Sequence, residues 1–209
     1  MQEPDAAGFV LAGGRSSRMG RDKALVEFRG QPLVAHALAI LREAGLSAVI
    51  AGAQPTLGTF APIVEDREPG LGPLGGVCAA MASATARWSV FVPVDLPLLP
   101  AALVRYLLNS ARVRGRAITL ASVAGFAQTF PAVVDRVALP GLRAELDAGR
   151  LGCFSAFRAA AAGLEQTVDA VSAEFLAQSA QVSHPDGLPA ARWFFNFNSP
   201  QDLREGEAP

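Results

Sequence analysis

Lysine occurs once in this sequence, because seventeen of its eighteen basic residues are arginine. The one lysine, Lys23, follows the apolar run 8–11 and the adjacent glycines Gly13 and Gly14. Backbone N–H groups of a glycine-rich turn and a nearby ammonium group both suit phosphate oxygens. Lysine supplies a compact point charge where arginine would supply a planar fork. The segment predicts a nucleotide-binding loop, and the alternative is a chance lysine on a solvated loop.

A carboxylate occupies a second position suited to chemistry. Asp95 lies between Pro93 and Pro97 at the end of the apolar run 88–94, so its backbone has little freedom. Reactions at the phosphates of a bound nucleotide commonly use a divalent cation, and Mg²⁺ binds one or two protein carboxylates together with phosphates and water. Asp95 is therefore the predicted Mg²⁺ ligand. The alternatives are an N-cap for a helix that begins near Pro100, or a solvated turn.

Two of the three asparagines, Asn196 and Asn198, alternate with phenylalanines near the C-terminus. This alternation is typical of a strand with one apolar and one polar face, and we predict a strand over residues 192–197. Serine and proline at 199–200 then predict the start of a helical turn. The two amides either face a ligand or satisfy backbone groups at the strand end.

Strand-like and helix-like segments alternate along the rest of the chain, which predicts a mostly parallel sheet in a three-layer α/β/α sandwich. Open sheets of this kind bind ligands beyond the carboxyl ends of their strands, so we expect loops 13–23, 65–76 and 94–100 to share one crevice. The predicted strands are 7–11, 46–51, 62–64, 88–94, 117–123 and 129–134. The predicted helices are 32–44, 74–86, 100–110, 139–147, 153–162 and about 173–180, with a terminal turn at 200–204.

The composition narrows the class of protein. With 209 residues and a net charge of −1, the chain is expected to be one domain with no nucleic-acid surface. Arg112, Arg114 and Arg116 are interpreted as a solvated helix end. Cys78 and Cys153 form no C-x-x-C pair, which indicates a reducing compartment. A polar start and the lack of a long apolar run predict a cytoplasmic protein that does not interact with membranes.

The first loop matches neither G-x-x-x-x-G-K-[ST] nor G-x-G-x-x-G. Its pattern, L-A-G-G-x-S-x-R-M-G-x-D-K-A-L over residues 11–25, resembles the signature of nucleotidyltransferases, and most of all that of the molybdenum cofactor guanylyltransferases. The resemblance continues to residue 203. It implies a nucleotidyltransferase (nucleotide-diphospho-sugar transferase-like) fold within a single domain, 1–209. The nucleotide half would span about 6–110 and the acceptor half about 111–204.

The resemblance also implies an activity, namely transfer of GMP from GTP to molybdopterin or molybdenum-loaded molybdopterin, with Mg²⁺, to give a guanine dinucleotide and pyrophosphate. Catalysis would fall to Lys23, Arg18 and Asp95, with Asp95 as metal ligand. Asn196 and Asn198 would face the acceptor. The expected nucleotide-binding residues are Leu11, Ala12, Gly13, Gly14, Ser16, Lys23, Gly52, Asp66, Gly75 and Asp95.

Two departures from the family pattern leave alternatives open. Gly52 stands where the family has asparagine, and residues 164–191 are longer than the usual connection. By the resemblance to the family, the Gly13–Gly14 pair implies guanine rather than cytosine, but a cytidylyltransferase for the same cofactor or a sugar-1-phosphate nucleotidyltransferase keeps the same chemistry. A nucleotide-binding accessory protein without catalysis is the alternative from another class. Other proteins of cofactor biosynthesis are possible partners. Asp66 has its own alternative, a charged surface turn.

Overall fold

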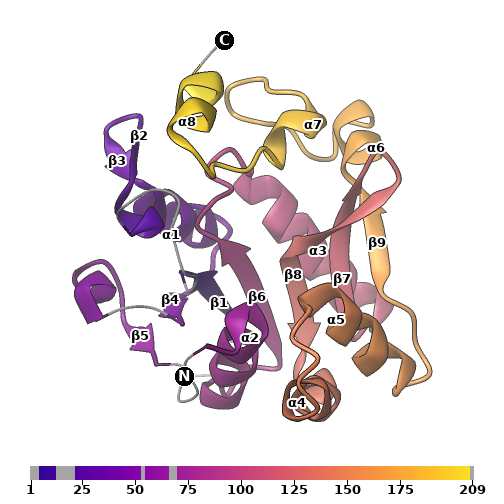
Figure 1. Cartoon of the computed structure of the whole chain (residues 1–209). Coiled ribbons are helices and arrows are strands. Elements are labelled where there is room, and N and C mark those ends of the chain that lie inside the picture. The colour runs from indigo at the N-terminus through magenta and orange to yellow at the C-terminus, as the bar shows by residue number, and fades with distance from the viewer. Residues whose placement is uncertain (1–4, 13–21, 53–54, 66–69, 208–209) are drawn as a thin grey trace.

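A seven-stranded sheet forms the centre of the molecule (Figure 1). The computed structural model describes residues 5–12, 22–52, 55–65 and 70–207. The strand order is β5-β4-β1-β6-β8-β7-β9, and only β8 runs antiparallel to its neighbours. The mostly parallel sheet is therefore confirmed. The strands are β1 (Ala6–Leu11), β4 (Ala48–Ala51), β5 (Ile63–Val64), β6 (Trp88–Pro93), β7 (Ile118–Val123), β8 (Phe126–Asp135) and β9 (Asp169–Ser172).

Helices cover both faces of the sheet, as predicted (Figure 1). Alternate side chains of each strand point to opposite faces, so Val10 and Phe9 belong to different hydrophobic cores. On one face the sheet packs against α1 (Leu33–Glu43) and α3 (Ala101–Arg114). On the other it packs against α2 (Gly72–Ser83), α4 (Leu139–Asp147) and α5 (Cys153–Ala162). The three-layer sandwich is therefore confirmed.

Smaller elements complete the described chain. A two-stranded hairpin, β2 (Glu27–Phe28) and β3 (Gln31–Pro32), leads into α1. The C-terminal part adds α6 (Ala173–Gln178), α7 (Ala190–Trp193) and α8 (Pro200–Glu207), which lie together along the upper edge of Figure 1. Three short 3-10 helices are η1 (Lys23–Leu25), η2 (Pro55–Thr59) and η3 (Arg136–Ala138).

The reversal at β8 has a local cause. A two-residue turn joins β7 to β8, and both of its residues have positive φ: 50° at Ala124 and 79° at Gly125. A turn of this kind folds two strands into a hairpin, because its twist matches that of the strands. The chain thus returns beside β7 without a crossover helix. Residues 117–123 and 129–134 form strands as predicted, with β8 starting earlier, at Phe126.

The predicted strand over 192–197 is wrong. Pro189 precedes a short helix, α7, that ends at Trp193, and the following residues join no sheet. The indole N–H of Trp193 donates to the Leu188 carbonyl at 2.8 Å, which closes this turn. The alternation of apolar and polar residues is nevertheless real. It places Phe197 in the core, fully buried, and leaves Asn198 exposed.

Candidate active site

Three side chains from distant parts of the sequence meet at one point. The Lys23 Nζ donates to Asp95 Oδ2 at 2.9 Å and to Asn198 Oδ1 at 2.6 Å. The Lys23 and Asp95 side chains are only 19% and 25% exposed. Because an ammonium group can only donate, the Asn198 amide must present its oxygen here. Lys23 is thus a partly buried cation shared by a carboxylate and an amide, and not a solvated loop residue.

Lys23 is the first residue of the 3-10 helix η1, which holds its backbone in place. The Asp22 carboxylate accepts the Ala24 N–H at 3.0 Å and so caps η1. The Val26 N–H donates to the Lys23 carbonyl, and the side chains of Ala24 and Val26 are buried in the core. The backbone that carries Lys23 is therefore anchored by the hydrophobic core and by the cap.

Asp95 lies just beyond the end of β6. The Val94 N–H donates to the Leu11 carbonyl at 3.3 Å, which ties this loop to the end of β1. The N-cap of α3 is Pro100, and no side chain caps that helix. The structure therefore rejects the helix-capping alternative for Asp95. Its carboxylate faces Lys23, while its carbonyl accepts the Phe197 N–H at 3.0 Å.

Asn198 is fixed by a second carboxylate, Asp202, which accepts the N–H groups of Asn198 and Ser199, each at 2.7 Å. Burial would raise the pKa of Asp202, but these N–H donors, the Ser199 hydroxyl and the Lys23 charge hold it below its usual value. Asp202 was not among the predicted site residues. The S-x-x-D spacing from Ser199 to Asp202, typical of a capping box, could have drawn attention to it.

Among the described residues, the expected nucleotide-binding side of the site consists of backbone and small or apolar residues. The Ala12 N–H donates to the Ala51 carbonyl at 3.2 Å, which joins the ends of β1 and β4. A methyl group on Gly76, in the first turns of α2, would lie within 3.9 Å of Leu11 and Gly52. The neighbouring Gly75 is buried. Leu11, Ala12, Gly52 and Gly75 thus come from three elements that converge at one end of the sheet.

Gly52 has a φ of 70°. This left-handed conformation is one that glycine and asparagine adopt more readily than other residues. The backbone at this position therefore also suits the asparagine of the family pattern.

Other predicted residues stand apart or lie outside the described residues. Asn196 is exposed, and its amide donates to the nearby Phe194 carbonyl at 3.4 Å. No contact described in the structure joins it to Lys23 or Asp95. Five predicted residues lie outside the described part of the chain: Gly13, Gly14, Ser16, Arg18 and Asp66.

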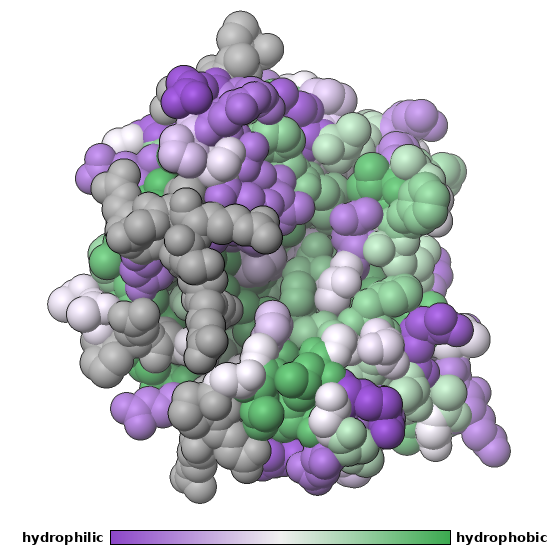
Figure 2. Space-filling model, viewed as in Figure 1, coloured by the Kyte–Doolittle hydropathy of each residue, from purple (hydrophilic) through white to green (hydrophobic). Residues whose placement is uncertain are grey.

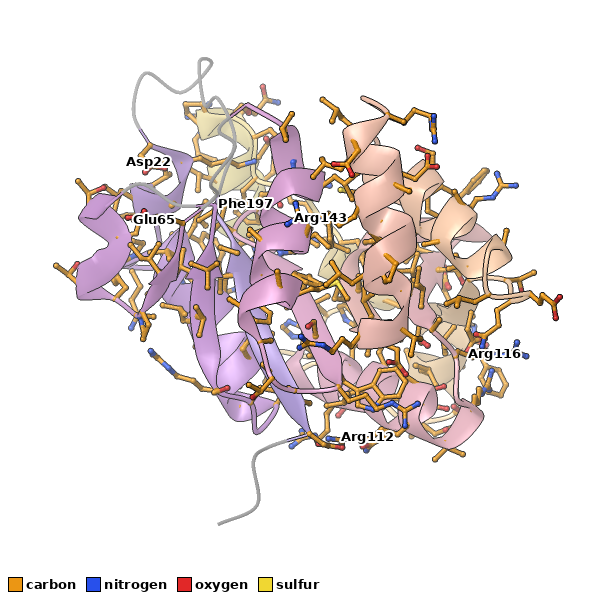
Figure 3. All side chains as sticks on the ribbon, turned by 90° about the horizontal axis from the view of Figure 1, so that it is seen from below. Asp22, Glu65, Arg112, Arg116, Arg143 and Phe197 are labelled. Atoms are coloured by element: carbon orange, nitrogen blue, oxygen red, sulfur yellow. The ribbon has the colours of Figure 1, made fainter. Side chains whose placement is uncertain are left out.

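The arginine cluster lies away from this site. In Figure 3, Asp22, Glu65 and Phe197 lie near the end of the sheet to which β1 points, and Arg112 and Arg116 lie toward the opposite end. Arg112 forms an ion pair with Asp5, and Arg114 forms one with Asp169. Arg112 and Arg114 lie in the last turn of α3 and Arg116 follows its C-cap, so the cluster is an exposed helix end, as predicted.

The exposed surface beside the site is mixed in character. Figure 2 shows hydrophilic side chains gathered at the top, over α8, and an apolar area across the middle of the same face.

Among the described residues there is no cluster of three or more His, Cys, Asp or Glu side chains that could hold a metal ion. No described helix has the length and hydropathy needed to cross a membrane.

Comparison of the sequence with known proteins identifies relatives that are nucleotidyltransferases. The MobA-like NTP transferase domain family matches residues 8–170. A molybdenum cofactor guanylyltransferase of Vibrio cholerae is 31% identical over 98% of this chain and 93% of its own length. One from Xanthomonas euvesicatoria is 49% identical over 109 residues, which are 51% of this chain and 56% of that relative.

A solved structure, molybdopterin-guanine dinucleotide biosynthesis protein A from Archaeoglobus fulgidus, shares the fold. Its TM-score is 0.76 at 19% identity, over 96% of both chains. The fold and the polar site beyond the strand ends define a nucleotidyltransferase of the α/β class. Within that class, the chain belongs to the MobA-like NTP transferase family, as the match over residues 8–170 shows.

Proposed function

We propose that this protein transfers GMP from GTP to molybdopterin or its molybdenum-loaded form, which yields the guanine dinucleotide and pyrophosphate. The proposal rests on the family and on one observation above all: Lys23 lies between Asp95 and Asn198 beyond the ends of β1 and β6. The relatives from Xanthomonas euvesicatoria and Vibrio cholerae are both named molybdenum cofactor guanylyltransferases, which supports guanine as the base.

In the proposed reaction, a terminal phosphate oxygen of the acceptor attacks the α-phosphorus of GTP. A new P–O bond forms there, and the bond from the α-phosphorus to the bridging β-oxygen breaks. Pyrophosphate leaves with the electron pair of that bond. Lys23 has three N–H donors, of which Asp95 and Asn198 take two. The third is available to a phosphate oxygen, so Lys23 would stabilise the charge that develops on the leaving group.

The residues present fit a magnesium ion bound together with the nucleotide. Asp95 offers a carboxylate and Asn198 an amide oxygen, both hard oxygen donors of the kind that Mg²⁺ prefers. The two oxygens already share one cation, the Lys23 ammonium. With so few protein ligands, phosphate oxygens and water would complete the coordination. When bound, the metal would neutralise phosphate charge and align the phosphates.

A nucleotide panel tests the proposal. Pyrophosphate release would be measured with GTP, CTP, ATP and UTP, each with and without molybdopterin and Mg²⁺. We expect release only with GTP, molybdopterin and Mg²⁺ together. A preference for CTP would assign the protein to the cytidylyl branch, and release with a sugar 1-phosphate as acceptor would assign it to the sugar enzymes. Binding of GTP without any release would favour an accessory protein.

A further inference from the structure

The carboxylate of Asp202 makes one more contact than helix capping requires. In a capping box, a carboxylate in the first turn accepts the N–H of the N-cap residue. Here Ser199 fills the N-cap position, and its hydroxyl accepts the Asp202 N–H at 3.3 Å. In return, the Ser199 N–H donates to the Asp202 Oδ2. It also accepts the N–H of Asn198, one residue before the cap, at 2.7 Å.

The additional bond acts on the residue that contacts Lys23. The backbone of Asn198 is tied to Asp202, and its side-chain oxygen reaches the Lys23 Nζ at 2.6 Å. One residue earlier, the Phe197 N–H donates to the Asp95 carbonyl. Asn198 thus lies between two attachments, one to the loop after β6 and one to α8.

Exposure explains why such attachments are needed. Asn198 is solvent-exposed, so burial does not fix its rotamer. A small change in its backbone would move the amide oxygen out of reach of Lys23.

We propose that Asp202 is a positioning residue for nucleotidyl transfer, which acts by holding Asn198 in contact with Lys23. The inference rests on the proposed function for its consequence in catalysis. Its structural half stands on two hydrogen bonds, from the Asn198 N–H to Asp202 and from the Lys23 Nζ to the Asn198 side chain, and it can be tested without any turnover.

The structural test uses the fact that the chain has one lysine. Labelling with ¹³Cε-lysine gives one lysine signal, from Lys23. Asp202→Ala should shift this signal and sharpen it as the side chain gains mobility, and Asp202→Glu should restore it. Ser199→Ala is the matched control, because it removes the cap hydroxyl but leaves the bond from the Asn198 N–H to Asp202. An unchanged lysine signal in Asp202→Ala would overturn the inference, as would equal changes in Ser199→Ala.

The catalytic test uses a double-mutant cycle with the nucleotide that the wild type turns over. Asp202→Ala should lower kcat/KM by about tenfold, in the range seen when a residue that orients a directly binding side chain is removed. In an Asn198→Ala background the same change should cost less than about twofold, because the residue that it positions is already gone. Losses that multiply would refute action through Asn198. If the lysine signal shifts as expected while GTP is not used, the proposed function fails and the positioning role remains.

Discussion

Lys23 shows how much one residue type can carry in this chain. No other lysine can replace its compact charge, and arginine differs in shape and in hydration. Its contacts with Asp95 and Asn198 hold the ammonium in place before a nucleotide arrives. A preorganised charge needs no rearrangement when negative charge develops in the transition state.

Lys23→Ala should therefore lower kcat for nucleotide transfer by about two orders of magnitude, the usual effect of losing one preorganised electrostatic group. The melting temperature should change little, because partly exposed ion pairs contribute only about 0–1 kcal/mol. Steady-state kinetics and thermal unfolding check both expectations. Arg116→Ala is a control that removes an exposed cation which lies toward the opposite end of the sheet (Figure 3). Near-full activity of Lys23→Ala would end its catalytic role.

Asp95 is a second residue for which shape and charge can be separated. Asp95→Asn keeps an oxygen in place but removes the negative charge, and a neutral amide is a poorer ligand for a hard cation. We expect turnover to collapse and the Mg²⁺ concentration for half-maximal rate to rise. Mn²⁺ binding in the presence of GTP, followed by electron paramagnetic resonance, should weaken in parallel.

The unliganded Asp95→Asn protein should lose little stability, because the carboxylate caps no helix and its partner Lys23 keeps Asn198 as an acceptor. A gain in stability would be expected only if Asp95 stood among unbalanced negative charge. The ion pair with Lys23 removes the reason for that gain. An unchanged Mg²⁺ requirement with normal turnover would exclude Asp95 from the mechanism.

At the scale of elements, the position of α8 depends on Gly206, where the helix contacts the core. The ring of Phe197 is fully buried and packs on Phe28 with the ring centroids 4.7 Å apart. Gly206 lies so close to it that an added Cβ would come within 2.2 Å of the Phe197 ring. Neither partner can yield easily, since Phe197 is enclosed by the core. The absence of a side chain at Gly206 therefore lets α8 pack over the site.

Gly206→Ala should destabilise the protein by about 1–3 kcal/mol, as overpacking of a filled core does. Urea unfolding gives the change in free energy. Gly163→Ala is the matched control: its added Cβ would meet only carbonyl oxygens at 3.6 Å, and its φ of −63° suits alanine. That variant should be neutral or more stable by up to about 1 kcal/mol. Equal effects of the two substitutions would contradict this account of α8.

Periodicity predicted the elements well where a helix or strand is buried on a regular face. The bounds of α4 and α5 match residues 139–147 and 153–162, since apolar side chains recur there at helical spacing. The hairpin that reverses β8 depends on two residues with left-handed backbone conformation. One of them is alanine, which rarely adopts it, so the residue types did not predict this turn. The strand predicted over residues 192–197 is wrong for another reason: alternation reports which side chains are buried, and a segment that belongs to no sheet can alternate as well.

At the scale of the whole molecule, the site depends on segments that the sequence could not bring together. Residue types identified Lys23, Asp95 and Asn198 one by one, and the rule for open sheets brought the loops after β1 and β6 together. Nothing in the sequence specified that residues near the C-terminus cross to the same point. That placement follows from Phe197, which packs against Phe28 in the hairpin before α1.

The long connection of residues 164–191 also contributes to this packing. It supplies β9 at the edge of the sheet, α6, and a loop that reaches back to the segment after β6. In that loop the His184 Nε2 lies 3.0 Å from the Leu98 carbonyl, and Nδ1 accepts the Asp186 N–H at 3.0 Å. Asp186 in turn forms an ion pair with Arg29 of the β2–β3 hairpin at 2.6 Å. One neutral imidazole thus joins three distant segments.

Burial lowers the pKa of His184 below its ordinary value of 6.5, although the Leu98 carbonyl and the Asp186 charge oppose this shift. The unfolded chain therefore binds a proton at a higher pH than the folded protein does. The stabilisation is complete above pH 6.5 and is lost as the pH falls through the lowered folded-state pKa. A proton on Nδ1 would also point at the Asp186 N–H and break that bond.

The free energy of unfolding should therefore fall between about pH 7.5 and 5 more steeply for the wild type than for His184→Gln, which keeps a donor for the Leu98 carbonyl but does not titrate. Urea unfolding of both proteins at several pH values gives the difference. Carboxylates whose folded-state pKa is lowered and which do not contact His184, such as Asp202, lose their contribution at more acidic pH, and they cancel because both proteins contain them. A difference in unfolding free energy that stays constant across this pH range would show that His184 does not titrate as its burial requires.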